Sequence, residues 1–505
     1  MNRLLTIDDS YQVINRKPLV MLIAPLQAEV SRLDLDYYNP QFLNLESQLQ
    51  ASGISRHPLE KLRKANRKIT DGIRERDEKK SGVPLVRTQD INDMVFSLES
   101  CMSISWAQHQ KNRKSSPHPG DLLIAIGGHL GNAALVPEEV PEVNIDRHIA
   151  IVPINENLAN VAYLWAFITS IYGTGILSRE ATGTVQRGVK LPNIRNLQVP
   201  LPPRPVQEYI GAKVRLAERC RLQARELRRE AQQCLETGVG LEIAISNEVA
   251  QGREFCTLSL KPEVAEVNPL LMSSRLDPAA YSPVRLALLE QLRDARCEFQ
   301  PLHMVADDVT KQRRRFMRNQ HIVSYFISIL HLNDKGFINL DDAAVHYPVS
   351  PGIVCETGDI LFSGINPSQN RVAVWTTEGQ ALCSAEFSIY RAKPGVPPHY
   401  LSFVWRSIYC LHQLEALTRG TSSSRRRLQE EDFEELMVPI LAPSELRLIS
   451  QNEQSAVRLD ILASKLIAES KADVEALIEK RLDVQGILTG HVQAPSWETL
   501  NLPSN

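Results

Sequence analysis

The sequence contains no closely spaced pair of cysteines. Its eight cysteines are scattered over 505 residues, with no C-x-x-C pair and no spacing typical of a metal site. Structural zinc sites usually take their ligands from such pairs, and disulfide frameworks are typical of much smaller secreted chains. We therefore expect reduced thiols and no bound metal.

Long hydrophobic runs are also absent. No stretch approaches the roughly 18 apolar residues that a transmembrane helix needs. Near the amino terminus, Asp8, Asp9, Arg16 and Lys17 precede a short apolar run at 19–23, which does not match a signal peptide. Together with the reduced thiols, these features predict a cytoplasmic protein.

An excess of charge of one sign is lacking too. Lysine and arginine total 57 and aspartate and glutamate total 59, for a net charge of −2, whereas nucleic-acid-binding domains are usually basic. The basic residues instead form clusters at 111–114, 311–318 and 425–427. A charge cluster is most often a solvated face, but clusters that recur in two parts of a neutral chain are candidate phosphate contacts.

Catalytic motifs are missing. A DNA adenine methyltransferase would need an Asn/Asp-Pro-Pro-aromatic box, but Asn39-Pro40 and Asn366-Pro367 are not followed by proline and an aromatic residue. Neither a P-loop nor an H-E-x-x-H motif is present. The Gly-rich segment 127–131 alone is a weak signal for a phosphate-binding loop. We expect no catalytic residues.

What the sequence does contain is a long repeat. Three motifs recur in the same order: Arg-Leu-Asp…Tyr-x-Pro at 32–40 and 275–283, Gly-Asp-Leu/Ile-Leu at 120–123 and 358–361, and Gly183 with Leu191 against Gly420 with Leu428. The copies are separated by about 240 residues, whereas solenoid repeats are about 20–50 residues long. The sequence therefore predicts two copies of a domain-sized unit.

The opening motif of each copy is interpreted as structural. An arginine beside an aspartate and an apolar Tyr-x-Pro segment is more typical of a local ion pair and a packing anchor than of a ligand site. This interpretation covers Arg32, Tyr38, Arg275 and Tyr281.

Each copy has the pattern of a mixed α/β domain. Short runs of β-branched and apolar residues, broken by turn residues, predict strands. They lie at 82–87, 121–126, 148–153, 322–332, 360–363 and 387–391. One helix is expected in each copy, at 161–170 and at 400–417.

Each copy ends in a long helical segment. A proline-rich connector at 200–205 leads into strong helix formers at 206–236, and Pro439 and Pro443 precede a similar segment at 444–483. At 1.5 Å per residue these helices would span roughly 45 and 60 Å. Their length favours pairing with each other as a coiled coil. The alternative is two amphipathic helices, each packed on its own domain.

The order of these segments resembles the specificity subunit of type I restriction-modification systems. The resemblance rests on the repeated motifs, on Gly-Val-Pro-Leu-Val-Arg-Thr-Gln-Asp-Ile at 82–91 and on the Val-Pro-Leu-Pro-Pro…Gln-Glu-Tyr-Ile run at 199–210, and it covers about residues 19–487. The second copy departs from the pattern, because it lacks the Gly-Val-Pro segment and has a different sequence at 438–445.

The resemblance implies an α+β fold with two tandem, pseudo-symmetric α/β target-recognition domains and two long helices in an antiparallel coiled coil. The expected boundaries are 1–203 for the first recognition domain, 204–240 for the first helix, 241–265 for a linker, 266–442 for the second recognition domain, 443–485 for the second helix and 486–505 for a loose tail.

The resemblance also implies the partners. In that family each recognition domain binds one half of a split, asymmetric DNA site, and the helices set the spacing and dock methyltransferase subunits. The expected partners are double-stranded DNA, two adenine-N6 methyltransferase subunits and restriction/motor subunits, and no membrane. No cofactor is expected on this chain; S-adenosylmethionine, Mg and ATP are expected on the partner subunits.

The candidate DNA contacts are chosen by side-chain chemistry, because Lys and Arg bind phosphates, Arg reads guanine, and Asn or Gln reads adenine. In the first copy they are Arg74, Arg76, Lys79, Lys80, Arg87, Thr88, Gln89, Lys111, Arg113, Lys114, Asn132, Gln186, Arg187 and Lys190, with His129 beside the Gly-rich turn. In the second copy they are Lys311, Arg313, Arg314, Arg315, Arg318, Asn366, Arg371, Ser422, Arg425, Arg426 and Arg427.

Several alternatives stay open. The loops after Gly183 and Gly420 fit either a DNA contact or a solvated surface turn. The whole chain also fits a scaffold that does not bind DNA, in which two α/β modules carry protein-binding helices. A specificity subunit of a methylation-only phage-defence system is a further alternative.

Overall fold

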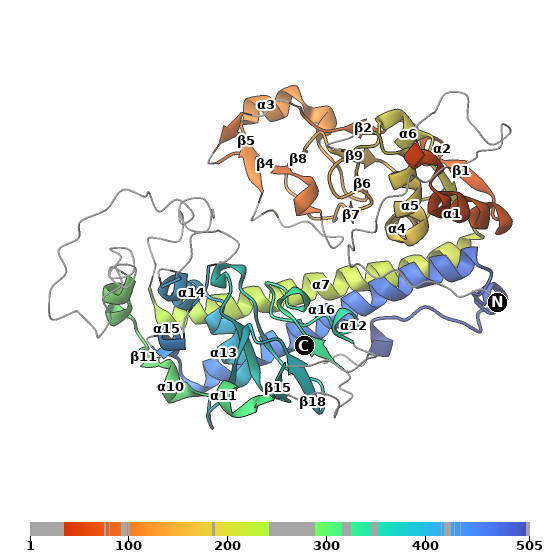
Figure 1. The fold of residues 1–505 in the computed structure, drawn as a ribbon. Helices are drawn as coiled ribbons and strands as arrows, with labels where there is room; N and C mark the ends of the chain where they lie inside the picture. Colours follow the sequence, from red (N-terminus) through yellow and green to blue (C-terminus); the bar gives the residue numbers. More distant parts are fainter. Residues whose placement is uncertain are drawn as a thin grey trace. The chain divides into compact units, whose positions relative to one another are not determined.

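The computed structural model describes residues 35–74, 77–79, 81–91, 98, 101–183, 187–241, 288–315, 325–344, 352–415, 417–418, 426–428, 430–434 and 436–500. It divides into two compact units (Figure 1). One contains residues 1–207 and 473–488, and the other contains residues 208–472 and 489–505. Arg32, Arg275 and Tyr281 of the opening motifs lie outside the described residues, whereas Tyr38 is 2% exposed, as expected for a packing residue.

The first repeat is built on a four-stranded antiparallel sheet. Its strands are β2 (Thr70–Asp71), β9 (Ile149–Val152), β6 (Leu122–Ala125) and β7 (Ala133–Leu135), in that order. All side chains of β6 and β9 are buried, because these apolar runs are covered on both faces. The strands predicted at 121–126 and 148–153 are confirmed.

Two further sheets, one of four strands and one of two, complete the first repeat. In one of them the order is β3 (Glu78–Lys79), β5 (Met102–Ile104), β4 (Val83–Val86) and β8 (Asn144–Ile145), and β4 runs parallel to β8. In the other, β1 (Arg56–Pro58) pairs antiparallel with β10 (Gln198–Pro200). The predicted strand at 82–87 is confirmed as β4.

The main sheet returns in the second repeat with the same order. Its strands are β12 (Ala306–Asp308), β19 (Phe387–Ala392), β16 (Ile360–Ser363) and β17 (Val372–Val374). The ribbon of β1 and β10 also returns, as β11 (Glu298–Pro301) with β20 (Met437–Ile440). The strands predicted at 360–363 and 387–391 are confirmed.

The remaining sheet of the second repeat consists of β13 (Arg314–Arg315), β15 (Gly352–Glu356), β18 (Gln380–Cys383) and β14 (Phe326–Ile327). The strand predicted at 322–332 is much shorter within the described part of that range. It covers only β14, and a 3-10 helix follows at Ile329–His331. The side chain of Ser328 caps this helix by accepting from Leu330 N.

The repeated Gly-Asp motif forms the turn that enters the central strand of each main sheet. Gly120 and Gly358 have φ of +77° and +88°, in the left-handed region that favours glycine. The next residue, Asp121 or Asp359, has a fully buried side chain. Asp121 Oδ2 accepts from the backbone N–H of His118 at 2.8 Å, and Asp359 Oδ2 accepts from that of Glu356 at 2.7 Å. The motif therefore forms the same hydrogen-bonded turn in both repeats.

Each buried aspartate is neutralised by arginine, but from different places in the chain. Arg67, which precedes β2, lies 2.6 Å from Asp121. Asp359 instead pairs with Arg313, which follows β12, and with Arg391 at 2.7 Å. A buried carboxylate needs such a partner, since its desolvation is otherwise costly. The aspartate is thus repeated while the position of its cation is not.

The prediction of one helix per repeat is wrong. The first repeat has α4 (Val161–Thr169) and α5 (Ile171–Glu180), and the second has α13 (Pro398–Trp405) and α14 (Ile408–Glu415). Ser170 interrupts the first pair because it leaves the helical conformation and its side chain caps α5 by accepting from Gly173 N. Ser407 occupies the corresponding break, where its hydroxyl donates to Val404 O.

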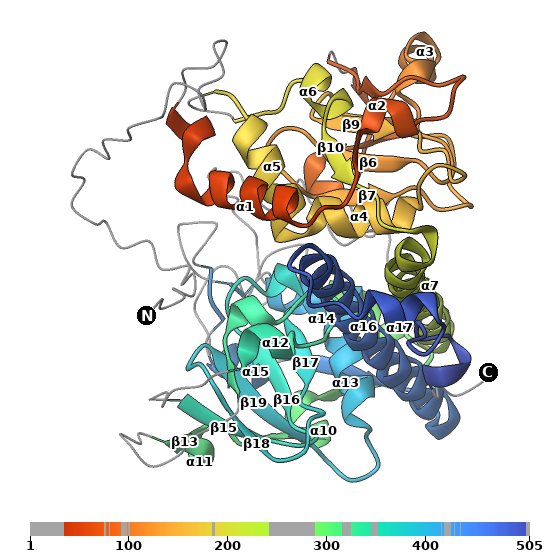
Figure 2. The same cartoon turned by 90° about the vertical axis from the view of Figure 1, so that its right-hand side faces the viewer.

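The first helix of each pair is attached in the same way. Tyr163 in α4 donates its hydroxyl to Pro200 O at 2.8 Å, and Tyr400 in α13 donates to Pro439 O at 2.6 Å. Trp165 Nε1 donates to Ala133 O, at the first residue of β7. Figure 2 shows α13 beside β17, the corresponding strand.

Other helices are short, apart from α1. They are α1 (Pro40–Ala51), α2 (Leu59–Leu62), α3 (Trp106–Lys111), α6 (Leu191–Arg195), α10 (Leu302–Val305), α11 (Thr310–Arg313), α12 (Leu340–Ala343), α15 (Glu430–Glu434) and α17 (Val484–Leu488). Among the residues that the structure describes, no single helix is long and apolar enough to cross a membrane; α4 and α5 pass that test only as a pair bent by 69°.

The two long helices, α7 (Arg204–Val239) and α16 (Pro443–Ile478), each have 36 residues, or about 54 Å. They lie side by side in Figures 1 and 2. Lys213 pairs with Glu469 at 3.6 Å, and farther along α7, Arg228 pairs with Glu453 at 3.2 Å. Residue numbers rise along one helix as they fall along the other, so the pair is antiparallel, as predicted.

Buried apolar residues recur along both long helices every three or four positions, as in a coiled coil. They include Val214, Ala217, Ala224, Leu227, Ala231 and Leu235 from α7 and Ala456, Leu459, Ala463 and Leu466 from α16. The second helix is shorter than predicted, because it ends at Ile478, shortly before Lys480, which has φ of +60°.

A buried ion network joins this coiled coil to the second repeat. Glu453 of α16 is fully buried and contacts both Arg228 and Arg406, which follows α13. Arg228 also reaches Asp460 at 2.6 Å. Burial lowers the pKa of Arg406 despite Glu453. At Arg228 burial acts in the same direction, but Glu453 and Asp460 together raise the pKa.

The segment after α17, part of the predicted loose tail, contains one short helix. A 3-10 helix forms at Glu498–Leu500. Just before it, the Trp497 ring lies 4.2 Å from the guanidinium carbon of Arg219 in α7. This cation–π contact places the tail against the coiled coil.

Candidate nucleic-acid interface

In each repeat the turn after the central strand carries polar and basic residues. The turn connects β6 to β7 in the first repeat and β16 to β17 in the second. Ala125 N donates to Asn132 O, and Ser363 N donates to Arg371 O. Because Ala125 and Ser363 are the last residues of β6 and β16, Asn132 and Arg371 occupy equivalent positions.

A second loop closes onto this turn in both repeats. In the first, Gly188 bridges antiparallel to Gly127, and Val189 N donates to Ile126 O at 2.8 Å. In the second, Arg427 bridges to Ile365, and Leu428 N donates to Gly364 O at 2.9 Å. The structure thus brings the loops near 187 and 427 against the turns, although they are far away in sequence.

We call the surface formed by this turn and the second loop the edge of each repeat. Several of the candidates chosen from the sequence lie on the edge of the first repeat. Thr88, two residues after β4 ends, lies near Gly128, since a Cβ added to Gly128 would lie 3.5 Å from Thr88 Oγ1. Asp146 N donates to Val86 O, and Arg147 N donates to Ile73 O. The exposed candidates on this edge are Arg74, Gln89, His129, Arg187 and Lys190.

Sequence reasoning missed Arg147. It is exposed, it lies between the ends of β4 and β2, and its Nε contacts His148 at 3.0 Å. A Cβ at Gly127 would lie 2.4 Å from His148 Nδ1, so the turn passes directly over this histidine. The signal that could have found Arg147 is a basic residue immediately before a predicted strand, at the end where the loops gather.

Lys111, Arg113 and Lys114 form a separate cluster around α3. Arg113 lies 3.0 Å from Glu142, and Lys114 O accepts from Thr70 Oγ1 at 3.4 Å. All three basic side chains are exposed. The cluster therefore lies beside β2 rather than on the Gly127 turn.

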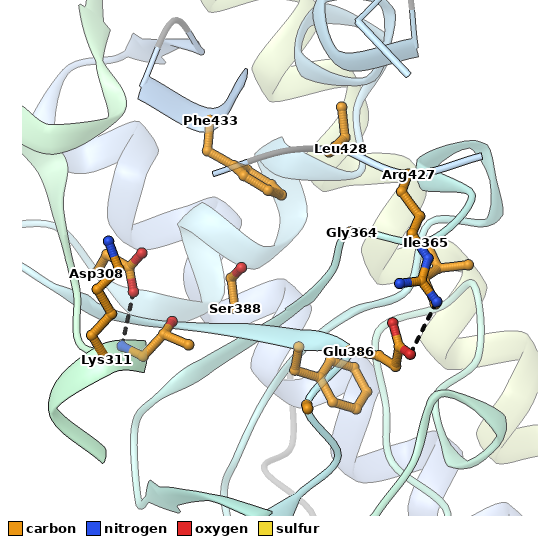
Figure 3. Close-up of a pocket in the computed structure, with 12 residues that line it drawn as sticks. Asp308, Lys311, Gly364, Ile365, Glu386, Ser388, Arg427, Leu428 and Phe433 are labelled. Carbon is orange, nitrogen blue, oxygen red and sulfur yellow. Dashed lines mark hydrogen bonds and ion pairs between the residues drawn. The ribbon is translucent and has the colours of Figure 1, made fainter. Parts of the chain in front are cut away.

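The equivalent edge of the second repeat is hollowed. A cavity of about 260 Å³ lies between the Gly364 turn, the Arg427 loop and α11. Figure 3 shows Arg427 and Glu386 facing each other on one side of it, with Lys311 and Asp308 on the other. Arg427 Nη2 lies 3.2 Å from Glu386 Oε1, and these side chains are 55% and 38% exposed. Basic, acidic and hydroxyl groups therefore converge on this cavity.

Two candidates have partners inside their own repeat. Arg313 is 15% exposed and pairs with Glu356 and the buried Asp359. Arg87 precedes a 3-10 helix at Thr88–Asp90, and its Nε lies 3.1 Å from Asp90 Oδ2. We assign a structural role to both arginines and do not place them in the proposed interface.

Some candidates lie outside the described residues. These are Arg76, Lys80, Gln186, Arg318, Ser422 and Arg425. Lys79, Arg314 and Arg315 belong to β3 and β13, but their side chains are not described. Asn366 has φ of +46° and Arg426 O accepts from Asn366 N, so both belong to the second repeat's edge.

Among the residues described, no group of three His, Cys, Asp or Glu side chains is placed to hold a metal ion. Described cysteines are free, and burial raises the pKa of Cys101 to about 12 and that of Cys220 to about 11. These thiols are therefore poor nucleophiles at neutral pH.

Part of this chain is similar to known proteins. Residues 60–215 match the family model of the type I restriction modification DNA specificity domain. That range contains the main sheet and the β3–β5–β4–β8 sheet of the first repeat; it begins after β1 and ends inside α7. The specificity subunit of the type I restriction enzyme EcoBI from Escherichia coli is 27% identical over 126 residues, which are 25% of this chain and 26% of that subunit. The match thus spans about a quarter of the relative's length.

Solved structures of similar proteins include the S subunit of a type I restriction-modification system from M. genitalium. That chain is 10% identical with a TM-score of 0.40, and the match covers 85% of this chain and 96% of the other. The HsdS subunit from Thermoanaerobacter tengcongensis is 16% identical with a TM-score of 0.25, over 85% and 97% of the two chains. The first repeat and the start of α7 thus contain a segment that matches the DNA specificity domain of type I restriction-modification systems.

Proposed function

We propose that this chain is a non-catalytic DNA-recognition subunit that reads a bipartite, asymmetric site in double-stranded DNA. The observation that carries the proposal is the repeated frame: the same four-stranded sheet occurs twice, with different side chains on the same edge. A domain of this size reads only a few base pairs, so two domains read two short blocks.

The two edges differ in the chemistry that recognises bases. The first repeat carries Asn132 where the second carries Arg371, and Gly188 where the second carries Arg427. Arg favours guanine and Asn favours adenine. Two edges that differ in this way fit two different half-sites and hence an asymmetric target.

The antiparallel helices fit the role of a spacer. A 36-residue helix is stiff along its roughly 54 Å, whereas a flexible tether would blur the distance between the half-sites. We further propose that two adenine-N6 methyltransferase subunits and restriction/motor subunits bind this chain. S-adenosylmethionine, Mg and ATP would act on those subunits, which would carry out the methylation and the cleavage.

Exchange of one recognition domain tests the proposal. Residues 266–442 are replaced by the corresponding domain of another specificity subunit, and methylated sites are mapped in cells that carry the hybrid and its methyltransferase. We expect one half of the site to change and the other half and the adenine chemistry to persist. A change in both halves, or in neither, contradicts modular reading.

The alternative is a scaffold that does not bind DNA. It is distinguished by binding of the purified chain to duplex DNA at increasing salt. If phosphate contacts dominate, log affinity falls linearly with log salt by about 0.9 per phosphate contact. No binding, or binding without salt dependence, favours the scaffold.

A further inference from the structure

The Arg427–Glu386 pair is built into the edge of the second repeat from both sides. Arg427 is in a β-bridge with Ile365, and the next residue, Leu428, is 8% exposed and packed in the core of the repeat. Glu386 comes directly before β19, whose first residue, Phe387, is 2% exposed. Their backbones are therefore fixed, while their side chains reach the surface.

The pair leaves the guanidinium able to contact a ligand. The ion pair involves Nη2 of Arg427, which is 55% exposed, and an arginine carries five N–H donors in a planar fork. The adjoining cavity of about 260 Å³ gives the fork room on the side that faces Lys311 (Figure 3). Because the Glu386 carboxylate already holds one end of the guanidinium, Arg427 loses less side-chain entropy when it binds a ligand.

The first repeat lacks this pair at the equivalent positions. Ser363 pairs with Phe387 across the second main sheet, and Ala125 pairs with Ile149 across the first. The residues before Phe387 and Ile149 are Glu386 and His148, which therefore correspond. The bridge position of Arg427 is taken by Gly188. The Arg427–Glu386 pair therefore occurs in the second repeat and not at the equivalent positions of the first, although both repeats have the same main sheet.

We propose that Arg427 reads a guanine in the half-site bound by the second repeat, with Glu386 as its positioning residue. The guanidinium of arginine matches guanine O6 and N7 in the major groove as a bidentate donor, and this contact discriminates strongly against other bases. Lys311, across the cavity, is exposed and binds phosphate as a point charge. This inference rests on the proposed function and adds the base and the residue that reads it.

The test is selection of the full-length chain on a randomised duplex library, with the wild type and four variants. The wild type should enrich a bipartite motif with a G·C pair in the block that changes when residues 266–442 are exchanged. Arg427→Ala should lose preference at that one position by about 10- to 100-fold, with the other positions retained. Arg427→Lys keeps the charge but not the fork, so its preference should be intermediate.

Two further variants separate base reading from loss of charge. Glu386→Gln should weaken the G·C preference at the same position and at no other, because it loosens Arg427. Lys311→Ala should weaken binding to all sequences equally and reduce the salt dependence by about one phosphate contact. If Arg427→Ala misfolds by circular dichroism, Arg427→Lys and Glu386→Gln decide the question.

The outcomes separate the two claims. If the wild type enriches no bipartite motif, the proposed function fails. If it does, but Arg427→Ala weakens all sequences uniformly as Lys311→Ala does, or leaves the G·C preference intact, only the assignment of Arg427 is overturned. A second-repeat block without G·C has the same consequence.

Discussion

The second four-stranded sheet differs between the two repeats in how its parallel strands are joined. In the first repeat, β4 and β8 are parallel, and β5 pairs with β4, which comes earlier in the chain. In the second repeat, β14 and β18 are parallel, and β15 pairs with β18, which comes later in the chain. The main sheets beside them keep the same order and the same Gly-Asp turn. The main sheet is therefore the same in both repeats, whereas the other four-stranded sheet and the loops differ. The proposed recognition of two different half-sites requires loops that vary on a constant sheet.

The two repeats also differ in their cations and in buried titratable groups. These differences lead to three predictions, and a feature that the two repeats share leads to a fourth.

The largest effect is expected from the ion network that anchors the second repeat. Glu453→Ala leaves Arg228 and Arg406 without their shared buried carboxylate, and loss of one partner of a buried pair costs about 3–5 kcal/mol. Urea unfolding measures the cost. Glu226→Ala, which removes an exposed partner of Arg229, should change stability little. Similar small effects for both variants would show that the network does not anchor the repeat.

The turn aspartates should give a smaller, unequal pair of effects. Asp121→Asn removes a charge that faces Arg67, whereas Asp359→Asn removes one that faces both Arg313 and Arg391. Charged hydrogen bonds contribute about 1.5–3 kcal/mol, and Asp359→Asn should be the more destabilising in thermal unfolding. The opposite order would contradict the view that the second repeat compensates its aspartate more strongly.

A pH effect is expected from His399 in the second repeat. Burial, with Arg458 and Arg406, lowers the pKa of His399 to about 4, and the unfolded value is about 6.5. The unfolded chain therefore binds the proton first as pH falls. The stability from neutral His399 is complete above about pH 6.5 and declines toward pH 4.

Urea titrations at pH 7 and pH 5 measure this effect. We expect a loss of about 1–2 kcal/mol at pH 5 that the variant His399→Gln does not show. The corresponding helix position in the first repeat is Ala162, which cannot titrate. An unchanged pH dependence in His399→Gln would refute the assignment.

The smallest effect tests whether α4 and α13 are attached to their repeats in the same way. Tyr163→Phe and Tyr400→Phe each remove one buried hydrogen bond to a proline carbonyl, with an expected cost of about 1 kcal/mol each. Burial raises the pKa of both hydroxyls, so they remain protonated donors at neutral pH. Costs that differ several-fold would mean that the two helices are not attached equivalently.

The sequence predicted the features that depend on periodicity. The apolar runs at β6, β9, β16 and β19 and the helical stripes of α7 and α16 follow from burial alone, and all were found. It did not predict the second helix of each pair: α5 begins after Ser170, where the predicted helix ends, and α14 begins after a break at Ser407 that lies inside the predicted helix. The partners of Asp121 and Asp359 also escaped prediction, since ion pairs across 54 and 46 residues depend on tertiary contacts.

Only part of the candidate interface could be predicted from the sequence, because its residues are brought together by tertiary contacts. Side-chain chemistry marked Arg427 and Asn132, but their placement on equivalent edges depends on β-bridges and hairpin register. Arg147 carries no motif and was found only where the strands end. Arg313 belongs to a conspicuous basic cluster, yet its side chain is nearly buried against Asp359.

We propose that the two repeats of this chain read two separate DNA blocks. Selection of the full-length chain on a randomised duplex library tests this proposal. We expect an enriched motif of two short, different blocks separated by a gap of fixed length and free sequence. A single contiguous block, two identical blocks, or no enrichment over random DNA would contradict it.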